Sequence, residues 1–279
     1  PRPGAGNPLA VVLDAQGLDD AAMQAIARWT RLPETTFVVT PKDPAASYGI
    51  RMFSPQKEVP FAGHPSVGTA HAVLSAGLAT PRDGQLLQEG IAGVLPLRVD
   101  TRDGIRTIAI RTPRARVAEV VTQDDARLQT AIAGWPQGAS PPVLMDGGRC
   151  WWLVELASEV ALRGLQPEWD AIAALAESTG SMGVFAWARC SGTDPHLAVR
   201  AFVGNGRRFE DAASGAANAV LAAWLHARGA VPGSDGHYVV SQGREVGHDA
   251  RLHLHVDADG EVWSGGEVQD VIRGELTWD

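Results

Sequence analysis

Residues 61–74, FAGHPSVGTAHAVL, share a pattern with residues 209–221, FEDAASGAANAVL. From Gly68 and from Gly215, both stretches read glycine, small residue, alanine, polar residue, alanine, valine and leucine. The two glycines lie 147 positions apart, a little over half of the 279-residue chain. This spacing predicts an internal duplication, provided that flanking features repeat as well.

The flanking features repeat in the same order and at nearly the same spacing. The matched pairs are helix-period stretches at 23–32 and 169–179, apolar runs at 35–39 and 183–187, and the segments IRMFS at 50–54 and VRAFV at 199–203. Arg51 matches Arg200 within the last pair. We therefore predict two homologous halves, with the two glycine motifs at equivalent places.

The composition is that of an ordinary globular protein, with 45% hydrophobic and 20% charged residues. The formal net charge is −8 and no basic stripe is present, which argues against nucleic acid and anionic membranes as partners. No apolar run is long enough for a membrane-spanning helix, and no signal-type segment opens the chain. We expect a small-molecule substrate and a cytoplasmic location. Because the chain begins at Pro1 rather than methionine, we expect upstream residues to be missing.

Periodicity and turn residues predict the elements of each half. Strands are expected at 9–13, 36–39, 50–53, 95–99, 105–110, 151–155, 183–188, 197–202, 238–241 and 252–256. Helices are expected at 19–31, 66–76, 169–179 and 214–228. The predicted division is an N-terminal lobe at 1–113, completed by 264–279, and a C-terminal lobe at 114–263.

Both glycine motifs place a small-residue loop before an alanine-rich helix. A helix start has unpaired N–H groups and a partial positive charge, so it favours an anion. Two such starts predict a cradle for a carboxylate or an enolate-like intermediate between the lobes. The spacing of 147 also aligns His64 with Asp211, an ionisable residue ahead of each helix. The alternative is that both helices are merely well packed.

Several segments together resemble, in order, the motifs of the PhzF-like family of phenazine biosynthesis. They are GNPLAVVLD at 6–14, LPETTFVV at 32–39, VPFAGHPSVGTA at 59–70, FEDAASGAA at 209–217 and GGEVQDVIRGEL at 265–276. The resemblance implies an α+β fold of the diaminopimelate-epimerase type: two pseudo-symmetric lobes, each a β-sheet wrapped around a central helix. It also implies an active site in the cleft between the lobes, a homodimer, and chemistry without cofactor or metal.

The best-known activity of that family is isomerisation of trans-2,3-dihydro-3-hydroxyanthranilate by movement of a proton. The resemblance implies that Glu34 is the acid and base of an isomerase, assisted by His64 and Asp211. The residues that it implies for substrate binding are Gly63, Ser214, Gly215 and Ala216. The expected substrate is a small carboxylate-bearing molecule.

This chain departs from the family pattern at three places. Pro33 stands where a serine commonly precedes the glutamate, and alanines replace residues of the usual EDPATGSA motif, Ala216 among them. A segment that often reads GRP is GHDA at 247–250. These changes leave the substrate open and keep the three ionisable residues.

Moving a proton between carbons requires a group that accepts, holds and returns it, which one carboxylate does when its pKa is raised. Burial and a neighbouring Asp211 carboxylate are expected to raise the pKa of Glu34. The structural alternative for Glu34 is a helix cap or a salt bridge, and for His64 a structural histidine. Asp211, just before a helix, is also expected to be its N-cap.

Two further functions remain open. An epimerase or racemase with two thiols needs a cysteine at each glycine motif, but Cys150 and Cys190 lie far outside both. They form no CxxC pair either, so no disulfide framework is expected. A non-catalytic small-molecule-binding protein is favoured by the lost hydroxyls. His253 and His255 are two potential metal ligands without a third, so we expect a solvated strand face there.

Overall fold

The computed structural model describes residues 2–118, 124–192 and 194–278. The chain divides into two compact units. Unit 1 comprises Pro1–Arg111 and Gly265–Asp279, and unit 2 comprises Thr112–Ser264.

Unit 1 is a mixed sheet with two helices. Its elements are β1 (Leu9–Val12), α1 (Asp20–Thr30), β2 (Glu34–Val39), β3 (Tyr48–Phe53), α2 (Gly63–Ser75), β4 (Gln85–Gly90), β5 (Gly93–Arg102) and β6 (Ile105–Arg111). The strands follow one another in the order β1-β2-β3-β4-β5-β6. The β1/β2 and β3/β4 pairs are parallel, and the others are antiparallel.

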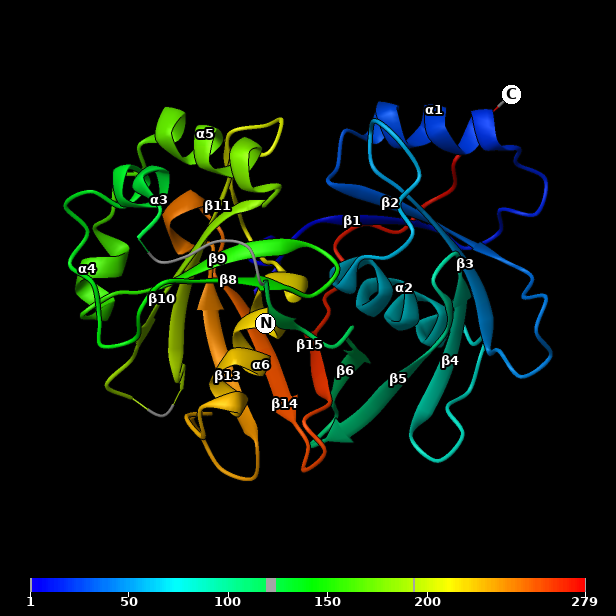
Figure 1. Cartoon of the computed structure of the whole chain (residues 1–279). Helices are drawn as coiled ribbons and strands as arrows, with labels where there is room; N and C mark the ends of the chain where they lie inside the picture. The colour runs from blue at the N-terminus through cyan, green and yellow to red at the C-terminus, as the bar shows by residue number, and fades with distance from the viewer. Residues whose placement is uncertain (1, 119–123, 193, 279) are drawn as a thin grey trace. The chain divides into compact units, whose positions relative to one another are not determined.

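Helix α2 is the centre of unit 1. It contacts β1 and β2 at one end of the strand order and β6 at the other, so the strands curl around it (Figure 1). Its side chains Val67, Ala70 and Val73 are buried in a cluster with strand residues such as Leu97 and Ile110. A helix that is apolar on most sides is stable only when it is enclosed in this way.

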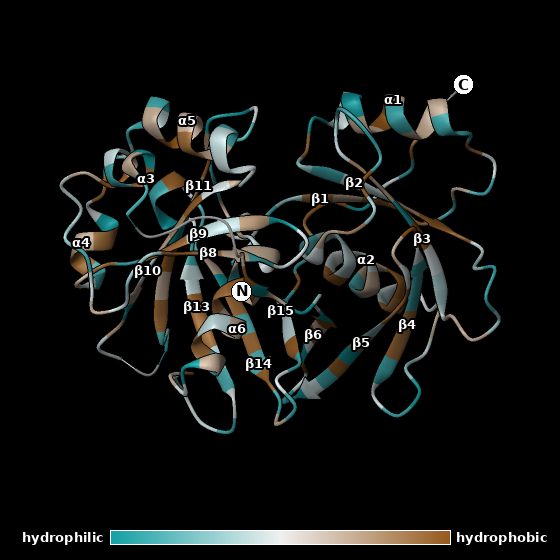
Figure 2. Ribbon diagram, viewed as in Figure 1, coloured by the Kyte–Doolittle hydropathy of each residue, from teal (hydrophilic) through white to brown (hydrophobic). Residues whose placement is uncertain are grey.

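Helix α1 covers the other face of β2 and β3. Met23, Ile26 and Ala27, spaced for one side of a helix, pack against Phe37 and Phe53. The other residues of α1 are exposed or half-buried, and Figure 2 shows hydrophilic and hydrophobic bands alternating along it. The helix therefore has one apolar side, as a surface helix should.

Unit 2 is a larger version of the same arrangement. Its elements are β7 (Arg116–Val117), α3 (Ala126–Ala131), β8 (Val143–Asp146), β9 (Cys150–Glu155), α4 (Glu159–Arg163), α5 (Trp169–Thr179), β10 (Gly183–Arg189), β11 (Leu197–Val203), β12 (Phe209–Asp211), α6 (Gly215–Ala227), β13 (His237–Gln242), the 3₁₀ helix η1 (Arg244–Val246), β14 (Ala250–Val256) and β15 (Val262–Glu267). The strand order is β15-β14-β13-β11-β10-β9-β8-β7, with β12 paired to β11. Strand β15 continues along the chain into unit 1.

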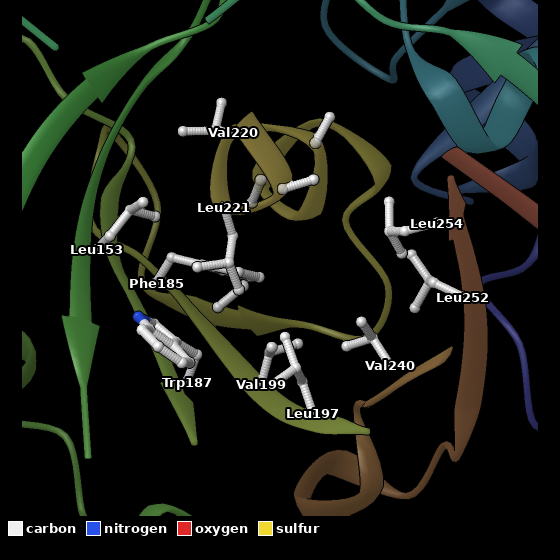
Figure 3. Close-up of a cluster of buried hydrophobic side chains, with 14 of the residues drawn as sticks. Leu153, Phe185, Trp187, Leu197, Val199, Val220, Leu221, Val240, Leu252 and Leu254 are labelled. Atoms are coloured by element: carbon white, nitrogen blue, oxygen red, sulfur yellow. The ribbon is translucent and has the colours of Figure 1, made fainter. Parts of the chain in front are cut away.

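Helix α6 takes the central place in unit 2. It contacts β14 near one end of the strand order and β7, β8 and β9 at the other. Figure 3 shows Leu221 of α6 facing strand side chains, among them Phe185 and Val199. Helices α3, α4 and α5 line a second core around Trp152 and Phe202. The unit thus has α6 on one face of its sheet and three short helices on the other.

The two units repeat the same order of elements. The segment α1-β2-β3-α2-β4-β5-β6 corresponds to α5-β10-β11-α6-β13-β14-β15, with β12 added. Strands β3/β4 and β11/β13 are parallel, whereas β2/β3, β4/β5, β10/β11 and β13/β14 are antiparallel. This agreement confirms the predicted fold class, an α+β chain of two pseudo-symmetric halves, each a sheet around a central helix.

The register of the repeat differs from the sequence-based alignment. Helices α2 and α6 have 13 residues each and begin at Gly63 and Gly215, so equivalent helix positions lie 152 residues apart rather than 147. Gly68 is the sixth residue of α2, whereas Gly215 is the first of α6. The shared letters are therefore not equivalent positions. Alanine-rich helices match one another in several registers, because small residues suit any side of an enclosed helix.

Helix α2 also begins earlier than predicted. The expected helix at 66–76 instead spans Gly63–Ser75, so His64 and Pro65 lie in its first turn. Proline is tolerated there because the first turn of a helix needs no N–H donors. The predicted helices at 19–31 and 214–228 agree with α1 and α6 once their capping residues are included.

No helix in the described part of the chain has the length and apolar character needed to cross a membrane.

Truncation of Leu221 tests the role of α6. Leu221→Ala should lower the free energy of unfolding by about 2–5 kcal/mol, because it removes a fully buried side chain from an enclosed helix. Urea denaturation measures the change. Leu78→Ala, at a leucine that is 55% exposed, is the control and should have a much smaller effect. Equal losses in both variants would contradict the central role of α6.

Candidate functional site

Glu34 is the first residue of β2 and pairs with Leu9 of β1. The start of this strand is tied to helix α2, because the hydroxyls of Thr36 and Thr69 are 2.7 Å apart in a buried contact. The Thr69 hydroxyl also donates to the Pro65 carbonyl, one turn earlier in α2. Strand β2 and the first turns of α2 therefore hold a fixed relation.

His64, the second residue of α2, faces Glu34. Its Nδ1 atom lies 3.7 Å from Glu34 Oε2, and both side chains are about one-fifth exposed, 20% and 19% respectively. Helix α2 approaches β1 closely, because a Cβ atom at Gly68 would lie 2.5 Å from a methyl group of Leu9. The imidazole also hydrogen-bonds the carbonyl of Pro8, the residue before β1. His64 and Glu34 are thus brought together within unit 1.

Burial lowers the pKa of His64 from 6.5 to about 4, although the Pro8 carbonyl partly opposes the shift. The imidazole is therefore neutral at pH 7. Its Nε2 atom is buried and has no hydrogen-bond partner among the described residues. A neutral imidazole beside Glu34 adds no positive charge there. A carboxylate that keeps its charge is able to accept a proton.

Asp211 is the last residue of β12 in unit 2. Burial raises its pKa, while hydrogen bonds from the Ala213 N–H and the Ser214 hydroxyl and the charges of Arg149 and His248 act in the opposite direction. The expectation that Asp211 caps a helix is wrong. Ser214 is the N-cap of α6, accepting a hydrogen bond from the Ala217 N–H, because the helix starts four residues beyond Asp211.

A buried polar network holds the loop from Asp211 to Ser214. Gln242 donates to the Asp211 carbonyl at 2.8 Å and accepts from the Ser214 N–H at 3.1 Å. Asn218 donates to the same amide oxygen of Gln242 and to the Ser214 carbonyl, both at 2.9 Å. Gly243 has a φ of +83°, and a Cβ atom there would lie 2.3 Å from the Ala212 carbonyl oxygen. The contacts with Gln242 and Gly243 therefore hold the loop in place.

The residues predicted to bind substrate lie at the two helix starts. Gly63 is the first residue of α2, Ser214 caps α6, and Gly215 and Ala216 are the first two residues of α6. Within unit 1 the structure brings together Gly63, His64 and Glu34. Within unit 2 it brings together Asp211, Ser214 and the start of α6. Their roles in binding stay predictions.

In the corrected register, neither His64 nor Asp211 has an ionisable counterpart in the other half of the chain. The 152-residue spacing makes Ala216 the counterpart of His64 and Val59 the counterpart of Asp211. The earlier alignment of His64 with Asp211 is therefore wrong. The candidate site arose in a duplicated fold, but its chemical groups are not duplicated.

The counterpart of Glu34 is Gly183, the first residue of β10. Gly183 has a φ of +141°, and a Cβ atom there would lie 2.1 Å from the Phe202 carbonyl oxygen. No side chain fits this position without movement of the backbone. The second half therefore has no room for a matching carboxylate.

Sequence reasoning missed the residues that support Asp211. Gln242, Asn218 and Arg149 carry no motif of their own, and His248 was noted only as part of the GHDA segment; only the fold brings them near one loop. The match between Arg51 and Arg200 was a usable signal, because both arginines bind a glutamate in the structure.

The histidines of β14 do not form a larger ligand cluster in the described segments. His255 stacks on His237 of β13 with ring centroids 3.9 Å apart, and no group of three or more His, Cys, Asp or Glu side chains suited to a metal lies in the described part. Both His253 and His255 are half-buried rather than fully solvated, which corrects the expectation for this strand face.

Neither cysteine lies at a glycine motif. Cys150 begins β9 and Cys190 follows β10, both in unit 2. Burial raises the pKa of Cys190 to about 12, and a hydrogen bond to Glu159 adds to the shift. Burial also raises the pKa of Cys150. Thiols of this kind stay protonated at neutral pH and are poor bases.

Comparison with known proteins gives the family. The model of the family described as "Phenazine biosynthesis-like protein" matches residues 1–272. The chain belongs to this family. A trans-2,3-dihydro-3-hydroxyanthranilate isomerase of Pseudomonas aeruginosa is 31% identical over 279 residues, 96% of this chain and 91% of that protein. "Antisense-enhancing sequence 1" of Schizosaccharomyces pombe is 30% identical over 97% of this chain and 93% of its own length.

Solved structures of related proteins share the fold. A PhzF-family protein of Bacillus anthracis has a TM-score of 0.78 and 23% identity, over 95% of this chain and 91% of that chain. A hydroxyproline epimerase of Agrobacterium vitis has a TM-score of 0.57 and 17% identity, over 85% of this chain and 73% of that chain. Named isomerases among the family's members support the predicted enzyme class.

The low pKa of His64 predicts a loss of stability in acid. The unfolded chain takes up this proton near pH 6.5 and the folded chain only near pH 4, so stability falls as the pH drops through this window, by about 3 kcal/mol in total. Urea denaturation of the native protein and of His64→Gln at pH 7 and pH 4 measures the effect. The variant should lack this part of the pH dependence. Identical pH dependence in both proteins would contradict burial of a neutral His64.

Replacement of the thiols tests the two-thiol alternative. Cys150→Ser and Cys190→Ser should each retain the turnover of the native protein, because both thiols are protonated and lie outside the candidate site. Steady-state rates of the two variants check this. A loss of turnover in a folded variant would revive thiol chemistry.

Proposed function

We propose that the chain is a cofactor-independent isomerase that moves a proton within a small carboxylate-bearing substrate. The observation that carries the proposal is the pair formed by Glu34 and the neutral His64, with 3.7 Å between Oε2 and Nδ1. In this proposal Glu34 removes the substrate proton and returns it at another carbon. Family membership and the named isomerase relatives support the reaction class.

His64 is proposed to lie beside Glu34 and to accept a hydrogen bond from the substrate at Nε2. Its buried Nε2 atom has no partner among the described residues, so it is available to a bound molecule. A neutral imidazole has one donor nitrogen and one acceptor nitrogen. The Pro8 carbonyl accepts from the ring, which fixes its direction. His64 then serves as an oriented partner rather than a positive charge.

Asp211 is the proposed third member. Burial raises the pKa of Asp211, and in this proposal its carboxyl donates a hydrogen bond to a developing negative charge when protonated. The starts of α2 and α6, with Gly63, Ser214, Gly215 and Ala216, are proposed to bind the substrate carboxylate through N–H groups. Ser214 contributes by fixing the start of α6, since its N–H donates to Gln242 and its hydroxyl caps the helix, and the free N–H groups are those of the residues that follow.

The absence of duplicated groups favours one proton-carrying residue over two opposed bases. Epimerisation by two bases needs a second base at an equivalent place, whereas Gly183 and Ala216 occupy those places. A single carboxylate that removes and returns the proton requires no such partner. We therefore propose an isomerisation in preference to an epimerisation.

Proton NMR in D₂O is the test, with trans-2,3-dihydro-3-hydroxyanthranilate as the first substrate because a named relative isomerises it. Glu34→Gln should reduce conversion and deuterium incorporation by about 100-fold or more, since the proton carrier is lost. Binding of the substrate should change by only a few-fold. Glu177→Gln, at an exposed position of α5, is the matched control and should behave as the native protein.

Normal turnover by Glu34→Gln would overturn the role of Glu34. No conversion by the folded native protein would overturn this substrate. If the native protein bound the compound without exchanging its protons, the non-catalytic binding function would gain support.

A further inference from the structure

Each unit contains an arginine–glutamate pair of the same geometry. In unit 1, Arg51 of β3 donates from Nε and Nη2 to the two carboxylate oxygens of Glu58, at 2.7 and 2.8 Å. In unit 2, Arg200 of β11 donates in the same way to Glu210, at 2.9 and 2.7 Å. Each guanidinium also lies over the phenylalanine ring two residues further along its strand.

The backbone around the two pairs is equivalent as well. Phe53 and Glu58 form an antiparallel bridge in unit 1, and Phe202 is paired with Glu210 in unit 2. In both units the pair therefore fastens the segment that leads to the central helix onto the preceding strand. Because the same bidentate pair occurs at equivalent places in both units, we infer that it was present before the duplication.

The pair in unit 2 is far more buried than its counterpart. The side chains of Arg200 and Glu210 are 6% and 4% exposed, against 26% and 25% for Arg51 and Glu58. Arg200 also donates from Nη1 to the Leu165 carbonyl at 2.7 Å, beyond the end of α4. The guanidinium is thus held by a carboxylate and by backbone oxygens together. A bidentate arginine–glutamate pair in this setting holds both side chains in one geometry.

The residue after each glutamate differs between the units. Glu58 is followed by Val59, whereas Glu210 is followed by Asp211. Neighbouring residues of a strand point to opposite faces of the sheet. Glu210 lies opposite Phe202, on the face covered by α4 and α5, and Asp211 lies opposite Ala201, on the face of α6. The pair thus holds β12 from the face opposite Asp211.

We propose that the Arg200–Glu210 pair is a positioning device for Asp211, fixing the three-residue strand β12 and so the place of this carboxyl beside the start of α6. Neither Arg200 nor Glu210 touches the substrate in this scheme. Such a short strand has few backbone bonds of its own and depends on its side-chain anchor. The inference rests on the proposed function for the catalytic role of Asp211.

Arg200→Lys is the test variant. Lysine keeps the charge but loses the planar fork that binds both carboxylate oxygens. Because the charge near Asp211 is retained, a change at Asp211 reports its position and not a lost electrostatic partner. Arg51→Lys makes the same substitution in unit 1 and is the matched control. Glu210→Asp, which shortens the other partner and keeps its charge, is the second variant if Arg200→Lys fails to fold.

Two measurements read the outcome: a carbon-13 NMR pH titration of the Asp211 carboxyl, and kcat and KM for the isomerisation. In Arg200→Lys the pKa of Asp211 should fall, because a loosened loop admits water and relieves the burial that raises it. The kcat should drop about tenfold or more, with a smaller change in KM. Arg51→Lys should leave the Asp211 titration unchanged.

A folded Arg200→Lys protein with the native Asp211 titration would overturn the proposal. Equal shifts in Arg200→Lys and Arg51→Lys would also overturn it, since they would indicate general loosening. The titration needs no substrate. A native protein without isomerase activity would therefore count against the proposed function, while the titration still decides the positioning role.

Discussion

The enclosure of one helix in each unit is the constraint on which the other features depend. Helices α2 and α6 bury side chains on most of their surface, and only strands that curl from one end of the sheet to the other cover them. The first turns of these helices then lie at the edge of the enclosure, where backbone N–H groups are not used inside the helix. His64 and the Ser214–Ala216 segment are placed there for this reason. In each unit, the position of these candidate residues follows from how the central helix is buried.

The sequence allowed a good part of the fold to be predicted, because alternating apolar runs and alanine-rich helices are local signals. The duplication and all four predicted helices were visible in this way. Strand β4, with the sequence QLLQEG, was missed because half of its residues are polar, and its buried Gln88 is satisfied by Tyr48 and Ser66 across the fold. Such pairing is set by tertiary contacts, and no local pattern reports it.

The candidate site was less accessible to sequence reasoning than the fold. Glu34, His64 and Asp211 were found through motif resemblance, whereas the register that relates them to the other half was misjudged from a repeated string of small residues. The network of Gln242 and Asn218 joins residues more than twenty positions apart, and only the folded chain shows it. Motif resemblance pointed to the groups that we propose for the chemistry, and the structure identified the groups that hold them.

The backbone at Gly183 restricts how this fold changes during evolution. After a duplication, a catalytic group in one half is usually a candidate for reappearance in the other, because the surrounding strands are already in place. Gly183, the counterpart of Glu34, cannot gain a side chain in this backbone, because any side chain would collide with the Phe202 carbonyl. A second carboxylate would require the β10–β11 hairpin to be rebuilt, which no single codon change accomplishes. Single substitutions in this chain are therefore held to one acidic group at these two equivalent strand starts, that of Glu34.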